Sequence, residues 1–194
     1  MKDDKSKPAF KQEHMTILSG SVMVSKTHGR IVFRGKIDTL QAELIEAQVL
    51  AAELCEEEDS AESEICRSLG EVLDFLRALM AAEVKESPLP PPSLFGMDAE
   101  DLHRQSHNTG KVLKVNQLPS HTQGKLAARL NLLRTKVREA ELLAVKVFGP
   151  PDNFDNTETD DTKGTKPRED IILALNRLSS ALWFLYCKYL SRKL

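Results

Sequence analysis

The chain has 194 residues, of which 41% are hydrophobic, 29% are charged and only 5% are aromatic, and its formal net charge is -2. This composition is typical of an ordinary globular protein, and the small net charge argues against a general nucleic-acid-binding protein, which would be strongly basic. A core with few aromatic residues and much Leu and Ala favours packed helices over a β-sandwich.

The cysteines and the N-terminus bear on the cellular compartment. Cys55, Cys66 and Cys187 form no C-x-x-C pair, so they predict neither a zinc site nor a disulfide framework, and three free thiols fit a reducing compartment. Residues 1–12 lack the apolar centre of a signal sequence, and no apolar run reaches transmembrane length. We therefore expect a cytoplasmic protein without a membrane partner or a nucleic-acid partner.

The first informative segment is Lys26–Asp38, KTHGRIVFRGKID. Its cationic side chains all occupy even-numbered positions: Lys26, His28, Arg30, Arg34 and Lys36. An extended backbone would place them on one face, and Asp38 would then cap a following helix. A basic strand that leads into a helix start suits a phosphate chain, whereas a solvated basic edge strand is the alternative.

The segment also divides the chain. Residues 1–25 are expected to form an N-terminal tail, and residues 26–194 are expected to form the domain. Within the tail, Met15–Leu18 and Val22–Val24 are short apolar patches that would be strands or loop anchors.

Four long stretches carry apolar residues at alternating steps of three and four, which is typical of amphipathic helices. They predict helices over residues 39–58, 60–84, 122–148 and 169–192. A short helix over 99–105 would begin after Asp98. The proline-rich segment 87–93 cannot be helical, and 106–121 and 149–167 are predicted to be loops. The elements predict an all-α fold, a bundle of four long helices and one short helix.

Polar residues lie beside the apolar seams of the last two helices. Those on the helix over 122–148 step by three and four and form one ridge: Asn131, Arg134, Arg138 and Glu141. The ridge is either a row of surface ion pairs or part of a cleft or subunit interface. On the next helix, Asn176 is a poor choice for a helix interior unless its amide is used. It would either bind a neighbouring helix or reach into the same cleft.

Several catalytic patterns are missing from the sequence. It contains no Walker A loop, no G-x-G-x-x-G and no G-x-S-x-G. Glu100–His103 is a single E-x-x-H, whereas a di-iron bundle needs two. A basic segment, an Arg/Glu ridge and an asparagine on a helical bundle remain, and together they suggest a phosphate-rich ligand.

Three segments resemble the ATP:cob(I)alamin adenosyltransferase family, and its ethanolamine-utilisation branch most closely. They are KTHGRIVFRGKIDTLQAEL (26–44), LNLLRTKVREAELLAVKVF (130–148) and DIILALNRLSSALWFL (170–185), the last of which is similar to the family's N-R-L-S signature. DAEDLHRQSH (98–107) also resembles that branch. The resemblance implies a trimeric five-helix bundle with sites between subunits, which transfers the 5′-deoxyadenosyl group of ATP to cob(I)alamin with the help of Mg²⁺.

The resemblance also implies site residues, position by position. Matching positions assign ATP binding to Lys26, Gly35, Arg138, Glu141 and Asn176. The alternation of cations and the closer branch add Arg30, Arg34 and Lys36 to the expected ATP-binding set. Within this set, Lys26 would bind the triphosphate, and Gly35 would let the backbone approach closely at a turn. Asp38 and Arg134 match a pair that forms a salt bridge between subunits. The apolar pocket for the corrinoid cannot be assigned to particular aromatic residues.

The implied partners are ATP, cob(I)alamin, further copies of the chain, and a cobalamin reductase or acceptor enzyme. Association with a cytoplasmic microcompartment is a further expectation.

Two features depart from the family. The branch usually carries a cysteine-rich metal motif before this region, so either this member works without that metal or the chain is part of a longer protein. Ser180 stands where the wider family has Asp. A non-catalytic cobalamin- or nucleotide-binding bundle, acting in delivery or as a scaffold, is the alternative function.

Overall fold

The computed structural model describes residues 12–150 and 167–193. Its elements in chain order are β1 (Met15–Ser19), β2 (Val22–Ser25), α1 (Gly29–Glu53), α2 (Ala61–Lys85), α3 (Ala99–His107), α4 (Thr109–Val112), the 3-10 helix η1 (His121–Gln123), α5 (Gly124–Phe148) and α6 (Glu169–Ser191). The described part is therefore mostly helical, but the prediction of an all-α fold with five helices is corrected in part. A small antiparallel hairpin of β1 and β2 and the short helix α4 are added to the five helices that the sequence predicts.

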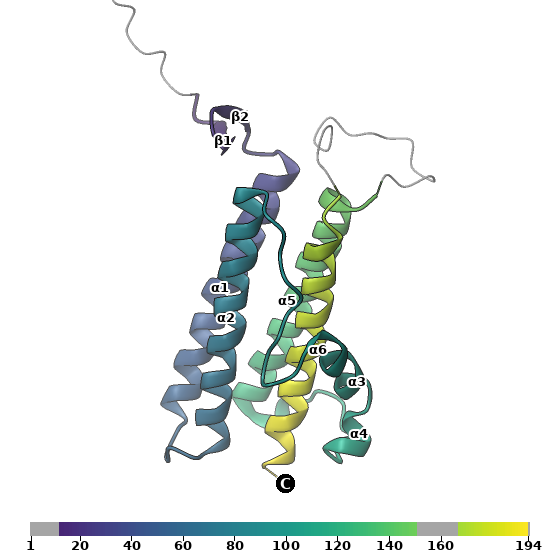
Figure 1. Cartoon of the computed structure of the whole chain (residues 1–194). Coiled ribbons are helices and arrows are strands. Elements are labelled where there is room, and N and C mark those ends of the chain that lie inside the picture. The colour runs from purple at the N-terminus through teal and green to yellow at the C-terminus, as the bar shows by residue number, and fades with distance from the viewer. Residues whose placement is uncertain (1–11, 151–166, 194) are drawn as a thin grey trace, which may run out of the picture.

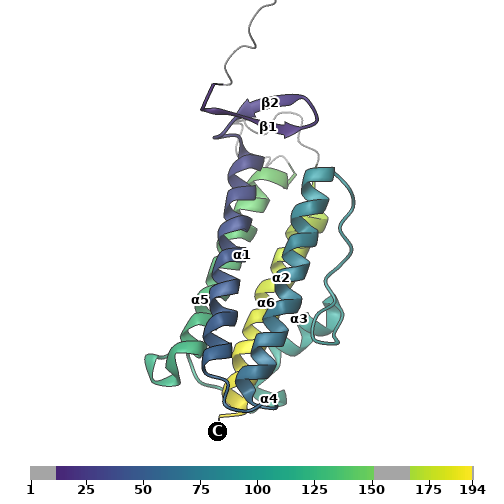
Figure 2. The same ribbon diagram turned by 90° about the vertical axis from the view of Figure 1, so that its left-hand side faces the viewer.

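The four long helices α1, α2, α5 and α6 lie side by side (Figure 1). α1 packs against α2 and α5, and α6 packs against α5 and α2, so the four helices form a bundle around one core. Figure 2 shows the hairpin across the end of the bundle where α1 begins, opposite the C-terminus. α3 packs against α6 from outside the bundle.

The three-four spacing predicts the core correctly. The apolar residues at this spacing are all buried on three helices. They are Ile65, Leu69, Val72, Leu76 and Leu79 on α2. On α5 they are Leu126, Leu130, Leu133, Val137, Ala140, Ala144 and Val147, and on α6 they are Ile171, Leu175, Leu178, Leu182 and Leu185. Ser60 caps α2, because its side chain accepts a hydrogen bond from the backbone N of Ser63 at 3.1 Å.

α6 is the most apolar of the long helices. Its length and composition would suffice for a membrane span, but 56% of that stretch is buried inside the bundle. Packing against α5, α2 and α3 explains why its sequence is so apolar. Such a composition is what a helix in the centre of a core requires.

The prediction of an extended segment over Lys26–Asp38 is wrong. Helix α1 begins at Gly29, where the side chain of His28 accepts a hydrogen bond from the backbone N of Arg30 at 3.2 Å. Asp38 and Gly35 therefore lie inside α1, and neither is at a cap or turn. Phe33 and Ile37 are fully buried and continue the seam of α1 towards its N-terminus, so the core requires a helix here.

The alternation of cations misled because a helix also brings Arg30 and Arg34 together, four residues apart. Both bind Glu83 of α2, whose side chain is fully buried: Arg30 Nε donates to Oε1 at 2.6 Å, and Arg34 Nε donates to Oε2 at 2.5 Å. Arg34 Nη1 also donates to the carbonyl oxygen of Leu18 in β1 at 2.8 Å. This network therefore joins α1, α2 and the hairpin.

The connection from α2 to α3 is not helical, as its prolines predict. It is held at the start of α6, where Asp170 accepts a hydrogen bond from the backbone N of Leu89 at 2.9 Å and Arg168 donates to the carbonyl oxygen of Ser87 at 2.9 Å. The predicted loop over 106–121 is corrected in part, because α3 extends to His107 and α4 follows it. The predicted loop over 149–167 lies mostly outside the described residues.

We predict that Glu83→Ala lowers the free energy of unfolding by about 3–5 kcal/mol, because it leaves two arginines without their buried carboxylate. Denaturant unfolding followed by circular dichroism measures this loss. Asp74→Ala, on the same helix, removes only an exposed ion pair with Arg77 and should cost less than about 1 kcal/mol. Equal, small losses in the two variants would contradict the structural role of Glu83.

Candidate functional site

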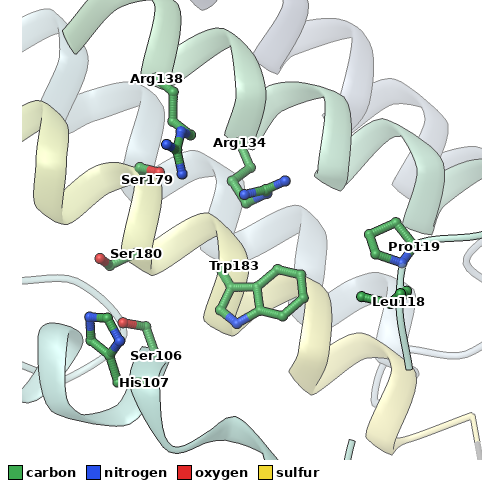
Figure 3. A pocket seen from close by; sticks show the side chains of 9 residues that line it. All are labelled: Ser106, His107, Leu118, Pro119, Arg134, Arg138, Ser179, Ser180 and Trp183. Atoms are coloured by element: carbon green, nitrogen blue, oxygen red, sulfur yellow. The ribbon is translucent and has the colours of Figure 1, made fainter. Parts of the chain in front are cut away.

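A pocket of about 350 Å³ opens between α3, α5 and α6 (Figure 3). Its lining side chains are Arg134 and Arg138 of α5, Ser179, Ser180 and Trp183 of α6, Ser106 and His107 of α3, and Leu118 and Pro119 before η1. The hydroxyls and cations lie mainly towards α3 and the middle of α5. The apolar groups lie towards the segment that precedes η1.

Two arginines of α5 bring positive charge to this pocket. Arg134 donates from Nε and Nη2 to Oδ1 of Asn131 at 3.2 and 3.1 Å. Burial, together with the neighbouring charge of Arg138, lowers the pKa of Arg134. Arg138 is exposed and makes no ion pair with any residue of the described ranges. A pair of neighbouring cations without a carboxylate between them suits an anionic ligand.

An aromatic stack forms the adjacent wall. The guanidinium of Arg134 lies 5.4 Å from the ring centroid of Trp183, in a cation–π contact. Trp183 in turn stacks on Tyr186, with centroids 5.2 Å apart and ring planes at 23°. Tyr186 is fully buried, so Trp183 presents its ring to the pocket against a fixed support.

The predicted polar residues of α5 and α6 meet beside the pocket. Nδ2 of Asn176 donates to Oε1 of Glu141 at 2.8 Å, and Nη1 of Arg177 donates to Oδ1 of Asn176 at 2.6 Å. The ridge on α5 and the asparagine on α6 thus share one hydrogen-bonded group, so Asn176 binds a neighbouring helix, which is one of the two predicted alternatives. Asn176 is exposed, so it remains accessible to a ligand.

Two histidines of α3 lie on the polar side of the pocket. The rings of His103 and His107 lie 4.4 Å apart, and His107 lines the pocket. Desolvation and the nearby charges of Arg177 and His107 lower the pKa of His103. The lowered pKa disfavours the charged form of His103, so the permanent positive charge near the pocket comes from the arginines.

Comparison with known proteins identifies the family. The family model for cobalamin adenosyltransferase matches residues 10–189. The chain belongs to this family. It is 35% identical over 176 residues to corrinoid adenosyltransferase EutT of Escherichia coli (strain K12). The aligned segment covers 90% of this chain and 58% of that protein. The EutT of Salmonella typhimurium (strain LT2) is 35% identical over 174 residues, which covers 89% of this chain and 57% of that protein. The chain therefore spans little more than half the length of these curated relatives.

A solved structure shares the fold. It is a variant of a PduO-type ATP:corrinoid adenosyltransferase from Lactobacillus reuteri, complexed with cobalamin and ATP. The alignment has a TM-score of 0.64 and 18% sequence identity, and it covers 92% of this chain and 89% of that chain. This likeness confirms the coarse prediction of a mostly helical, adenosyltransferase-like fold, but not the count of five helices.

The residues that the family resemblance assigns to ATP fall into two groups in the structure. Arg138, Glu141 and Asn176 lie together beside the pocket. Lys26 is exposed directly after β2, where its backbone N donates to the carbonyl oxygen of His14 at 2.8 Å. Lys36 of α1 pairs with Glu139 of α5. Within the described ranges of this single chain, no ion pair or hydrogen bond joins Lys26 to the pocket.

Four other predicted residues have specific surroundings. Arg30 and Arg34 bind Glu83 and are largely buried, so their charges serve the bundle. A Cβ on Gly35 would meet no atom within 4 Å, so this face of α1 is open. Asp38 is exposed on α1. Its predicted salt bridge with Arg134 of another subunit stays a prediction.

Sequence reasoning missed the pocket residues outside α5 and α6. These are Ser106, His107, Leu118 and Pro119. The similarity of 98–107 to the family and the missing periodicity of 106–121 mark both segments as unusual, but neither signal assigns a residue to a pocket. The row that contains Asn176, Ser179 and Trp183 is visible in the sequence, whereas the choice of Trp183 as pocket wall needs the fold.

The described residues offer no protein cage for a metal ion. Within 12–150 and 167–193, no three His, Cys, Asp or Glu side chains gather as ligands. Cys187 is buried, and burial raises the pKa of its thiol. A protonated, buried thiol is a poor metal ligand and a poor nucleophile.

We predict that Arg138→Gln leaves the free energy of unfolding within about 0.5 kcal/mol of wild type or raises it, because an exposed cation that repels Arg134 contributes little to folding. Thermal unfolding without ligand measures this. The same scan with added tripolyphosphate should stabilise wild type more than the variant. A loss above about 1 kcal/mol without ligand would mean that Arg138 has a structural role instead.

Proposed function

We propose that the protein is a corrinoid adenosyltransferase, which transfers the 5′-deoxyadenosyl group of ATP to cob(I)alamin. The observation that carries the proposal is the joint placement of two arginines and an aromatic wall on one pocket, in a member of the cobalamin adenosyltransferase family. The relatives named corrinoid adenosyltransferase EutT support the corrinoid as acceptor and ethanolamine utilisation as the setting.

The cationic side of the pocket would take ATP. Arg138 has no described carboxylate partner and can form charge-assisted hydrogen bonds with phosphate oxygens. Glu141 and Asn176, already joined at 2.8 Å, offer a carboxylate and an amide to the nucleoside. Lys26 would add a phosphate contact from the hairpin of a neighbouring subunit, because this single chain does not bring it to the pocket.

The apolar side would take the corrin ring. Trp183, Leu118 and Pro119 offer flat and apolar surface, which a large macrocycle needs to replace water.

The reaction requires little acid–base chemistry from the protein. The electron pair of Co(I) forms a bond to C5′, and the electrons of the C5′–O bond leave with the triphosphate. Since no proton moves at the reacting atoms, no general base is needed. The side chains must hold C5′ in line with cobalt, neutralise the leaving group and exclude water. Mg²⁺ bound by phosphate oxygens and water would share the neutralisation.

The proposed assembly is a homotrimer of helical bundles, with Asp38 of one subunit paired to Arg134 of the next. Exposure of Asp38 on α1 leaves it able to reach a neighbour. A cobalamin reductase or an acceptor enzyme would complete the pathway, in the cytoplasm or at a microcompartment.

A direct assay tests the activity. Purified protein, ATP, Mg²⁺ and chemically reduced cobalamin are mixed without oxygen, and the visible spectrum of adenosylcobalamin is followed. In parallel, the fluorescence of Trp183, the single tryptophan of the chain, reports corrinoid binding. Corrinoid binding without product under strict reduction would favour the non-catalytic alternative. The absence of both binding and product would refute both functions.

We predict that Lys26→Ala and Arg138→Ala each lower kcat/KM for ATP by about 10–100-fold, since each removes a charge-assisted phosphate contact worth about 1.5–3 kcal/mol. Arg77→Ala is the matched control, because it removes an arginine from the exposed surface of α2. If both site variants keep the wild-type dependence on ATP, the ATP site lies elsewhere.

We predict that Arg134→Ala and Asp38→Ala each weaken the oligomer, because either change removes one partner of an ion pair between subunits. Sedimentation velocity over a range of protein concentrations measures the dissociation. Arg129→Ala, which breaks the ion pair with Glu46 within one chain, is the control. Intact oligomers in both variants at the lowest concentration would rule out the intersubunit pair.

A further inference from the structure

The side chain of Gln123 connects the two apolar walls of the pocket. Its Oε1 accepts hydrogen bonds from the hydroxyl of Tyr186 at 2.6 Å and from the backbone N of Ser120 at 2.8 Å. Its Nε2 donates to the carbonyl oxygen of Leu118 at 3.1 Å and to Oε1 of Gln117 at 3.3 Å. The amide thus uses two donors and two acceptor positions, which fixes its orientation.

One of these walls is the segment before η1. The side chain of Leu118 is 83% exposed although it lines the pocket. Core packing therefore does not hold Leu118 in place. Two hydrogen bonds hold the backbone on either side of Pro119 instead: Gln123 donates to the carbonyl oxygen of Leu118 and accepts from the backbone N of Ser120. They fix the positions of Leu118 and Pro119.

The other wall is Trp183, which stacks on Tyr186. Tyr186 is fully buried, and burial raises the pKa of its hydroxyl, so the hydroxyl stays protonated and acts as donor to Gln123. A single hydrogen bond from Tyr186 to Gln123 therefore ties the position of the Trp183 ring to that of Leu118 and Pro119.

We propose that Tyr186 and Gln123 are positioning residues that set the separation between the Trp183 wall and the Leu118–Pro119 wall. Neither residue lines the pocket, so each acts through the groups that do. The separation of the walls fixes how a flat apolar macrocycle sits beside the arginines. This inference rests on the proposed function, under which the macrocycle is the corrin ring.

The test uses Tyr186→Phe, which removes the hydroxyl and keeps the ring that supports Trp183. Hydroxocobalamin is titrated into the variant of the whole chain while the fluorescence of Trp183 is followed. The loss of one net hydrogen bond should raise the Kd for the corrinoid about fivefold. KM for the corrinoid should rise with it in the adenosylation assay, whereas KM for ATP should stay unchanged.

Tyr189→Phe is the matched control, because the chain has only two tyrosines. The hydroxyl of Tyr189 donates to Glu62 at 3.0 Å, on the same helix but outside the pocket lining. It should leave the Kd for hydroxocobalamin unchanged. A wild-type Kd in Tyr186→Phe, or an equal loss in both tyrosine variants, would overturn the proposal.

Gln123→Met keeps the proposal testable if Tyr186→Phe does not fold. It keeps the length of the side chain and removes all four hydrogen bonds, so it should weaken corrinoid binding at least as much as Tyr186→Phe. The double variant should bind no more weakly than Gln123→Met alone, since both changes break the same contact. Additive losses would refute the coupling. If wild type itself binds no corrinoid, the proposed function fails. If wild type binds the corrinoid and the variants bind it with the same Kd, only the positioning role fails.

Discussion

The burial of α6 is the constraint on which both the core and the pocket depend. α5, α2 and α3 all pack against this helix, so an apolar sequence covers most of its surface. The side of α6 that carries Ser179, Ser180 and Trp183 is left to line the pocket. The same packing that stabilises the bundle therefore leaves one strip of α6 for recognition, and it holds that strip next to the arginines of α5.

The cations of the chain have two separate uses. Arg30 and Arg34 bind Glu83 and join the hairpin to α1 and α2, whereas Arg134 and Arg138 face the pocket. In the proposed trimer, the hairpin of one subunit and the pocket of another together complete an ATP site. The hairpin must then be held firmly, and the bond from Arg34 to the carbonyl oxygen of Leu18 provides this.

Much of the fold can be predicted from the sequence, because the three-four spacing of apolar residues depends only on helix geometry. The seams of α2, α5 and α6 follow from it, as does the neighbourhood of Glu141 and Asn176. The start of α1 could not be predicted this way. Residues four apart, such as Arg30 and Arg34, lie on the same face in a strand as well as in a helix. The position of Leu118 could not be predicted from the sequence either. It depends on a hydrogen bond from Gln123 to its carbonyl oxygen, and the spacing of apolar residues does not indicate such a bond.

The ion pairs around Glu83 have a consequence for the electric field of the protein. Arg30 and Arg34 are balanced by Glu83 and by Glu86, to which Arg30 donates at 2.6 Å, so this group is formally neutral. Its field falls off quickly with distance, although the sequence marks the segment as strongly basic. Long-range attraction of a polyanion must then come from cations outside this group, among them Arg138 at the pocket and the exposed Lys26. The rate of encounter with such a ligand, and its dependence on ionic strength, therefore depend less on Arg30 and Arg34 than the sequence of this segment suggests.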